Sequence, residues 1–231
     1  MWAVLATLAF ALQTPSEGGA APEPVTAAMA QANKARVATR PVYKSGPSPD
    51  IPEAVRATGA HGKVVVSGVI GADGRFTETK VAVSSRSSLL DAAALEQVSA
   101  MIFEPARDAE GVALSLPART PLEFTNAKSE GKGGGVLRYG CSQFARDYDW
   151  WYATWPATEH DDFYYLVLGL SALSTASASG RFDVASFGKG YEGFEPRWKA
   201  AVEACRKAPQ RLFIDVFKPE GDFLRRGAAG R

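Results

Sequence analysis

The sequence predicts an α+β fold, in which a small antiparallel sheet with helices on one face is followed by a smaller, mainly helical domain. Three observations predict it. From residue 62 the pattern has a period of two with apolar residues on both faces, and over residues 112–124 apolar residues alternate. Asp73-Gly74 is a hairpin signal, because a primed turn needs positive φ. Beyond residue 137 the apolar residues return to helical spacing.

Length and charge bound the function classes. The chain has 231 residues, of which 46% are hydrophobic and 10% aromatic, the balance of a globular protein with one large or two small domains. Its formal net charge is +1, and no basic run is longer than Arg225-Arg226. Such a chain offers no basic patch to a phosphate backbone, so nucleic acid is not an expected partner.

The N-terminal segment predicts export. Residues 2–12 form an apolar run far shorter than the roughly 20 residues that span a bilayer. Ala9-Phe10-Ala11 supplies the small residues that a cleavage enzyme needs, although no Lys or Arg precedes the run. We interpret residues 1–21 as a signal peptide or a short apolar anchor. Residues 22–44, rich in Ala and Pro, are predicted to be a flexible tether.

Caps and turn residues predict the first folded elements. Asp50-Ile-Pro-Glu53 pairs a capping residue with a proline in the first turn of a short helix, and Gly59 suits its end. Residues 62–70 alternate with apolar side chains on both faces, which is typical of a strand. The Asp73-Gly74 turn then leads into a return strand over residues 77–83.

A capped amphipathic helix is expected next. Ser88 is the expected N-cap, and the carboxylate of Asp91 would reach back to the cap amide and meet the positive end of the helix dipole. The helix is expected to stop before Pro105, because the residue ahead of a proline is pushed out of the helical region. Five apolar residues share one stripe that needs a sheet beneath it: Leu90, Ala94, Val98, Met101 and Ile102.

The last strand of this domain is expected over residues 112–124. Its even-numbered residues share one face and are mostly apolar. Pro117 and Pro121 have the same parity, so both remove backbone donors from the same edge. The odd-numbered edge is therefore expected to lie at the rim of the sheet or to be bulged.

Taken in order, the motifs of residues 45–126 resemble the C-terminal domain of the TonB energy-transducer family. The resemblance implies a periplasmic domain that receives a short peptide from TonB-dependent outer-membrane receptors as an added strand. It also implies energy from an inner-membrane motor of the ExbB and ExbD type. The motifs are the stretch from Pro49 to Val66, Gly71-Ala-Asp-Gly-Arg75, Val83-Ser-Ser85, Leu90-Asp-Ala-Ala-Ala-Leu95, Phe103-Glu-Pro-Ala106 and Leu122-Glu-Phe124.

The resemblance also implies a partner-binding site without a cofactor. Ile51-Pro52 stands where the family has Tyr-Pro. A bound peptide is expected to protect the amides of Ser115 and Arg119 from exchange. A second copy of the chain, as a homodimer, is a further candidate partner, and an uncleaved N-terminal segment would tether the protein to the inner membrane. The expected partner-binding residues are Ile51, Pro52, Arg56, Ser115, Pro117, Arg119 and Pro121.

Residues 127–136, rich in Gly and Lys, are predicted to link this domain to a mainly helical domain over residues 137–231. Its two cysteines, Cys141 and Cys205, favour a structural disulfide in an exported protein, the alternative being two separate buried thiols. An aromatic stripe at helical spacing is interpreted as core, with a partner or glycan platform as the alternative: Phe144, Tyr148, Trp151 and Trp155.

Further elements are expected in this domain. Asp161-Asp162 caps an uncharged helix that ends at Ser179-Gly180. A glycine-rich loop over residues 188–193 precedes a helix over residues 196–207, whose inward face carries Cys205. Residues 212–217 are expected to be a strand or a helical turn, and the tail from Gly221 is expected to be loose.

The sequence indicates no catalytic site and no metal site. The two cysteines and the two histidines, His61 and His160, have no short ligand spacing between them. Acidic residues near the aromatic stripe leave a hydrolase in the second domain as a remote alternative: Asp147, Asp149, Asp161 and Asp162. The other alternative is a structural adaptor of the cell envelope, in which the helical domain masks the receptive strand edge.

Overall fold

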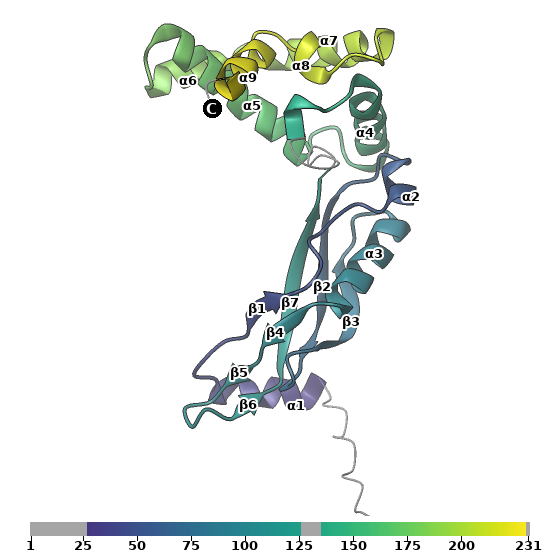
Figure 1. Ribbon diagram of the computed structural model, residues 1–231, viewed down its shortest axis with the longest axis vertical. Helices are drawn as coiled ribbons and strands as arrows, with labels where there is room; N and C mark the ends of the chain where they lie inside the picture. The colour runs from purple at the N-terminus through teal and green to yellow at the C-terminus, as the bar shows by residue number, and fades with distance from the viewer. Residues whose placement is uncertain (1–26, 126–134, 230–231) are drawn as a thin grey trace, which may run out of the picture.

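The computed structural model describes residues 27–125 and 135–229. It consists of a sheet part and a helical part that meet end to end (Figure 1). The predicted signal segment 1–21 lies outside the described residues, as does the predicted linker 127–136 apart from its last two residues. Those two begin the short 3₁₀ helix η2 (Gly135–Leu137) of the helical part.

The sheet confirms the predicted α+β fold. Its three strands are β2 (Gly62–Ile70), β3 (Phe76–Val83) and β7 (Leu116–Phe124), all antiparallel, in the order β3-β2-β7. The predicted turn joins β2 to β3, and its Gly74 has φ of 79°, with the Gly71 amide bonded to the carbonyl of Arg75. Because β2 is the central strand, β3 and β7 lie at the two edges of the sheet.

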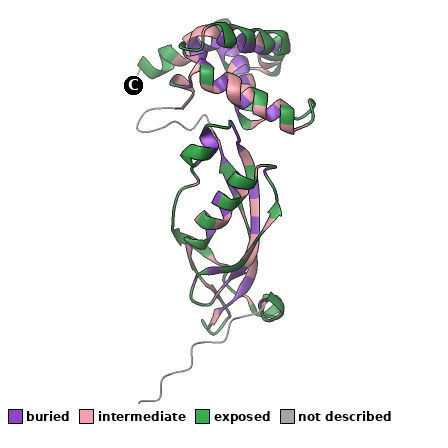
Figure 2. Cartoon of the chain, turned by 90° about the vertical axis from the view of Figure 1, so that its right-hand side faces the viewer, coloured by how far each residue is buried: buried purple, intermediate pink, exposed green. Residues whose placement is uncertain are grey.

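The core lies between the sheet and α3 (Ser88–Ser99), which packs on β2 and β3. Even-numbered side chains of β2 and β7 face this helix, whereas the outward sides of the helices are exposed (Figure 2). Burial of these apolar side chains is what holds helix and sheet together. The fully buried members contributed by the strands and α3 include Val64, Val66, Leu90, Ala94, Val98, Leu122 and Phe124.

The ends of α3 differ from the prediction by one residue at the start and by several at the finish. Ser87, not Ser88, is the N-cap and accepts from the Leu90 amide. Asp91 does not return to the cap but accepts from the Ser85 amide and from two serine hydroxyls. The helix ends at Ser99, well before Pro105, because the next residues pair as strand β4 (Ile102–Glu104).

The first helix is also capped differently from the prediction. Pro52 is the N-cap residue of α2 (Glu53–Arg56), and no side-chain hydrogen bond caps this helix there. Asp50 instead accepts from the Ile51 amide and from the Arg56 guanidinium. Gly59 has φ of 81° beyond the end of this helix, in the left-handed region that glycine tolerates, as predicted.

The segment predicted as a flexible tether carries regular structure from residue 27 onward. It contains α1 (Ala27–Ala32), the 3₁₀ helix η1 (Asn33–Arg36) and strand β1 (Val42–Ser45). α1 packs against β7, and β1 pairs antiparallel with β4. The tether prediction was therefore wrong for this portion, because packing on the sheet supplies order that the local pattern does not.

Residues 112–124 form two strands rather than one. β6 (Ala113–Leu114) pairs with β5 (Ala106–Arg107) in a separate two-stranded sheet, and β7 begins only at Leu116. Ser115 lies between them, where its side chain accepts from the Ala72 amide. The alternation predicted the faces correctly but could not show this break.

The helical part has six α-helices within the described residues, in addition to η2. Phe144, Phe163, Trp198 and Phe213 pack together in its centre, and the predicted disulfide joins Cys141 to Cys205. No helix of the described chain is long and apolar enough to cross a membrane. The helices are α4 (Cys141–Thr154), α5 (Asp162–Ser179), α6 (Val184–Tyr191), α7 (Phe194–Lys207), α8 (Phe213–Val216) and α9 (Glu220–Ala229).

Three local predictions in this part are corrected or resolved. Most of the glycine-rich stretch predicted as a loop lies inside α6. There Gly190 packs so closely on Ala172 that a Cβ added at Gly190 would lie 2.3 Å from the Cα of Ala172. Residues 212–217 form a helical turn. The tail from Gly221, predicted to be loose, is α9, because Gly221 packs against Ile214 and Phe217 accepts from its amide.

Candidate partner-binding edge

β7 is the edge strand of the sheet. It pairs with β2 along its whole length, from Leu116 opposite Ile70 to Phe124 opposite Gly62. On its other side no strand of the described chain is paired with it. An edge strand of nine residues presents a row of main-chain groups to which another strand can bind.

Two prolines fix which amides of β7 point outward. Pro117 and Pro121 lie opposite Val69 and Val65 in a continuous ladder with β2. Proline has no N–H, so a proline facing β2 would leave a ladder acceptor without a donor. Because alternate residues point their amides to opposite sides, the odd-numbered amides face the open edge. Arg119 and Glu123 are therefore the outward donors of the strand.

The odd-numbered side chains lie on the face of the sheet opposite α3. There, Ser67 of β2 lies between Lys80 of β3 and Arg119 of β7 in one cross-strand row. No salt bridge to Lys80 or Arg119 is present in the described chain, whereas Lys63 lies directly opposite Glu123. This row, with Lys34 of η1 and Glu78 of β3, borders a hollow of about 450 Å³, so three basic side chains and one carboxylate lie beside the middle of β7.

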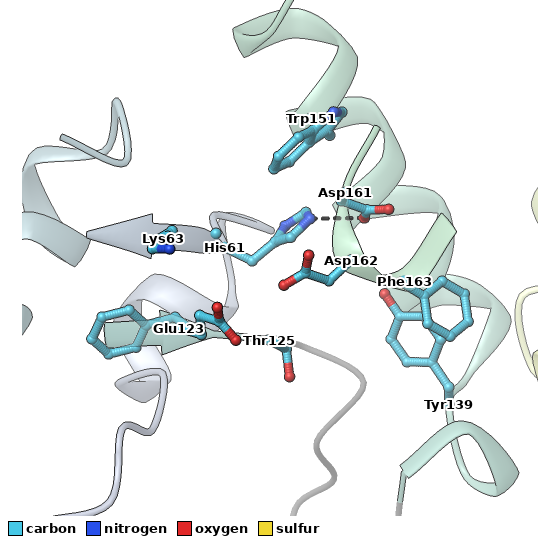
Figure 3. Close-up of a pocket in the computed structure, with 11 residues that line it drawn as sticks. His61, Lys63, Glu123, Thr125, Tyr139, Trp151, Asp161, Asp162 and Phe163 are labelled. Carbon is cyan, nitrogen blue, oxygen red and sulfur yellow. Dashed lines mark hydrogen bonds and ion pairs between the residues drawn. The ribbon is translucent and has the colours of Figure 1, made fainter. Parts of the chain in front are cut away.

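The helical part meets the sheet at the end where β2 begins and β7 finishes (Figure 1). His61 makes the central contact: its Nε2 lies 2.9 Å from Oδ2 of Asp161, and its Nδ1 lies 2.7 Å from the Gly59 carbonyl oxygen. Its ring stacks on Trp151 and tilts against Trp150, with centroids 5.2 and 5.3 Å away. Figure 3 shows the ring pointing at Asp161.

A second contact joins the two parts beside α3. Arg86, a non-glycine residue with φ of 66°, donates to the Thr154 carbonyl at 2.8 Å. Its guanidinium carbon lies 3.9 Å from the centroid of the Trp155 ring, a cation–π geometry. Gly59 lies against the backbone of Arg146. The junction therefore draws on two segments of the sheet part, one at residues 59–61 and one at Arg86.

A cavity of about 220 Å³ lies at this junction, and its walls combine aromatic rings with charged side chains (Figure 3). Burial, with the nearby negative charges of Glu123 and Asp161, raises the pKa of the Asp162 carboxyl. No group of three His, Cys, Asp or Glu side chains in the described chain could hold a metal ion. The lining residues are His61, Gly62, Lys63, Glu123, Phe124, Thr125, Tyr139, Trp151, Asp161, Asp162 and Phe163.

Comparison with known protein families accounts for the sheet part. Residues 47–125 match the family model described as Gram-negative bacterial TonB protein C-terminal. This segment is a TonB C-terminal domain. The match covers about a third of the chain and does not extend to the helical part. No curated protein matches the chain.

The residues predicted at the entry of the TonB C-terminal domain do not lie at its open edge. Ile51 is only 2% exposed and belongs to the core. The Arg56 guanidinium is buried, donates to the Ile51 carbonyl at 3.0 Å and faces the carboxylates of Asp50 and Glu53. Pro52 precedes α2 beside them. These residues fix the start of the domain, so we do not place them in the partner site.

Ser115 also lies away from the open edge. It is buried, its carbonyl accepts from the Asn33 side chain, and its hydroxyl accepts from the Ala72 amide. Pro117 is half-buried, whereas Arg119 and Pro121 are exposed on β7. Of the seven predicted residues, the TonB C-terminal domain therefore brings together Pro117, Arg119 and Pro121, and its geometry adds Glu123.

Sequence reasoning missed the role of His61. The local pattern places this residue in a turn and makes Asp161 a solvated helix cap. Asp161 is indeed the N-cap of α5, accepting from the Tyr164 amide, but its other oxygen binds His61. The only local signal was the placement of His61 between two glycines that allow close approach, and nothing in the sequence linked it to a residue 100 positions away.

Proposed function

We propose that the chain is a periplasmic TonB-like protein whose β7 edge receives an extended peptide from a TonB-dependent outer-membrane receptor. The observation that supports this proposal is the open edge of β7 in a TonB C-terminal domain. The peptide binds as an added strand, in which main-chain hydrogen bonds give affinity and side-chain contacts give choice.

The two prolines weaken the pairing of β7 with the peptide, because each lacks an amide donor. They also set the register of the peptide by limiting the donors at the open edge to Arg119 and Glu123. Over residues 117–123 the open edge keeps the carbonyls of all four odd-numbered residues but only two of their amides. Each missing main-chain bond forfeits about 0.5–1.5 kcal/mol. The peptide is therefore held mainly around Arg119 and Glu123, and its side chains carry more of the selectivity than in a fully paired strand.

The proposal extends to transport across the outer membrane. A peptide held at β7 lets a pulling force act on the receptor, and an inner-membrane motor of the ExbB and ExbD type is the source of force that the resemblance implies. The helical part would move with the domain, because His61 and Arg86 join the two. A homodimer that pairs two β7 edges is a competing occupant of the same site.

The adaptor alternative requires the helical part to cover the receptive edge. In the structure the helical part meets the end of the sheet, near Gly62 and Phe124, rather than the middle of β7. Arg119 and Pro121 remain exposed. The arrangement thus favours an accessible edge over a masked one.

The experiment is amide exchange on the full chain with and without a receptor-derived peptide. We expect slower exchange at Arg119 and Glu123 and no change at Val83, which belongs to the opposite edge strand. Arg119→Pro removes an outward donor and should reduce peptide affinity several-fold. Arg119→Gln keeps that donor and is the matched control for lost charge.

Two outcomes would contradict the proposal. One is a bound peptide with unchanged exchange at both Arg119 and Glu123, which would place the peptide elsewhere. The other is protection of these amides that depends on protein concentration and needs no peptide. That result would assign the edge to a second copy of the chain.

A further inference from the structure

The surroundings of His61 define its protonation state. Both ring nitrogens face oxygen atoms that only accept: the Gly59 carbonyl at 2.7 Å from Nδ1, and the Asp161 carboxylate at 2.9 Å from Nε2. A neutral imidazole carries one proton, so one of its nitrogens would point a lone pair at an oxygen. Only the imidazolium donates at both positions. The geometry therefore favours a charged histidine.

This charge is buried between the two parts of the protein. His61 is 6% exposed and packs against the rings of both Trp150 and Trp151 of α4. A buried charge is costly unless it is paired and hydrogen-bonded. Other charged groups surround the contact as well: Asp147 and Arg146 on α4, Asp162 on α5, and Lys63 and Glu123 on the sheet strands.

Asp161 joins the histidine to the helical part. Its Oδ1 accepts from the Tyr164 amide as the N-cap of α5, while its Oδ2 accepts from His61. One carboxylate thus fixes the start of a helix and holds a side chain of the TonB C-terminal domain. Loss of one histidine proton would leave either this half-buried carboxylate or the Gly59 carbonyl facing a lone pair.

We propose that protonated His61 latches the helical part onto the end of the TonB C-terminal domain, and that loss of this proton releases it. The latch sets where the helical part lies relative to the finish of β7. It does not depend on which partner the β7 edge binds.

The direction of the pKa shift agrees with this proposal. Burial alone lowers the pKa of His61, but the hydrogen bond and charge of Asp161, the Gly59 carbonyl and the charge of Asp147 outweigh it and raise the pKa above 6.5. A histidine whose pKa is higher in the docked than in the undocked state contributes its full stabilisation of docking when the pH is below the undocked pKa. That contribution is lost as the pH rises through the raised value.

The first test follows histidine protonation directly in the full chain. The chain has two histidines, so ¹⁵N-labelled imidazole signals can be assigned by comparison with His160→Gln. We expect His61 to be doubly protonated at pH 6.5 and to titrate above it. Asp161→Asn keeps an N-cap, since Asn caps as well as Asp, but removes the charge, so the pKa of His61 should fall. A neutral His61 tautomer at pH 6.5 in the wild-type chain overturns the proposal.

The second test follows docking. The radius of gyration of the full chain, measured by small-angle scattering between pH 5.5 and 9, should increase as His61 loses its proton. His61→Gln cannot carry the charge and should give a radius that no longer changes over this titration, whereas His160→Gln should behave as wild type. Equal pH profiles for wild type and His61→Gln would show that docking does not depend on this proton.

Discussion

Gly59 illustrates how a single residue connects the local fold to the contact between the two parts. Its φ of 81° is a conformation that side chains with a Cβ rarely adopt, and a Cβ here would stand 2.8 Å from the Arg146 carbonyl oxygen. Sequence reasoning identified the helix end but not the neighbour across the junction. The backbone conformation is local, whereas the close approach depends on α4.

Gly59→Ala is therefore expected to destabilise the protein by more than backbone strain alone. Gly111 is a matched control, because its φ of 82° is nearly the same but a Cβ added there would meet nothing within 4 Å. Gly111→Ala should cost about 1 kcal/mol, and Gly59→Ala clearly more. Urea denaturation of both variants measures the difference. Equal losses of unfolding free energy in the two variants would show that the junction accommodates the added Cβ without cost.

Asp147 is the other residue whose chemistry was not evident from the sequence. It is buried in α4, accepts from the Tyr139 hydroxyl at 2.5 Å and lies 3.3 Å from the Arg146 guanidinium. Burial raises the pKa of its carboxyl to about 6, although the Tyr139 hydrogen bond and the charges of His61 and Arg146 oppose the shift. The Tyr139 and Arg146 contacts thus hold this carboxyl inside the helical part.

This raised pKa predicts a pH dependence of stability. A carboxyl whose folded pKa is raised makes the folded state bind protons more tightly, so its contribution falls as the pH rises from about 4 to about 6. Asp147→Asn keeps an acceptor for Tyr139 and should remove that slope, worth at most about 3 kcal/mol. Denaturation midpoints at several pH values test this. An unchanged slope would contradict the raised pKa.

At the scale of elements, the sheet was largely predictable and the element ends were not. Alternation and the Asp73-Gly74 turn predicted β2 and β3, because burial on one face imposes a period of two. The start of α3 shifted to Ser87, since Asp91 binds the loop before the helix instead of the cap. Several successive serines can each act as the N-cap, and the surrounding contacts determine which of them does.

The basic row across the sheet makes a prediction about the peptide at β7, which rests on the proposed function. Lys80 and Arg119 flank Ser67 two strand spacings apart, about 10 Å, with Lys34 nearby. A peptide with Glu opposite Arg119 should bind up to about fivefold more tightly than one with Gln, because exposed charge pairs contribute about 0.2–1 kcal/mol. The preference should shrink at high salt.

Calorimetric titration with the two peptides measures this preference. Arg119→Gln and Lys80→Gln should each reduce it. Lys63→Gln is the control, because Lys63 lies opposite Glu123 at the start of β2 and outside the row that holds Arg119. Equal affinities for both peptides would refute the charge preference while leaving strand addition intact, whereas no binding of either peptide would refute the proposed function itself.

At the scale of the whole molecule, the disulfide and the aromatic core stabilise the helical part. Cys141 of α4 and Cys205 of α7 close a span of 64 residues. The double variant Cys141→Ala, Cys205→Ala should lose about 4 kcal/mol in the chain-entropy model. The loss should appear in the unfolding of the helical part, monitored by its tryptophan fluorescence. Unfolding at the wild-type midpoint would show that packing alone sustains this part.

The sequence by itself determined the α+β class, the hairpin and the family of the sheet part, because these follow from short-range periodicity, turn chemistry and ordered motifs. It favoured a disulfide between Cys141 and Cys205, but only the structure decided that pairing. Only the tertiary structure decided which end of the sheet meets the helical part and which predicted residues reach the open edge. His61 and Asp161 meet across 100 positions, and Ser115 is buried by Asn33 and Ala72. Such contacts depend on how separate elements pack in space, which no local pattern encodes.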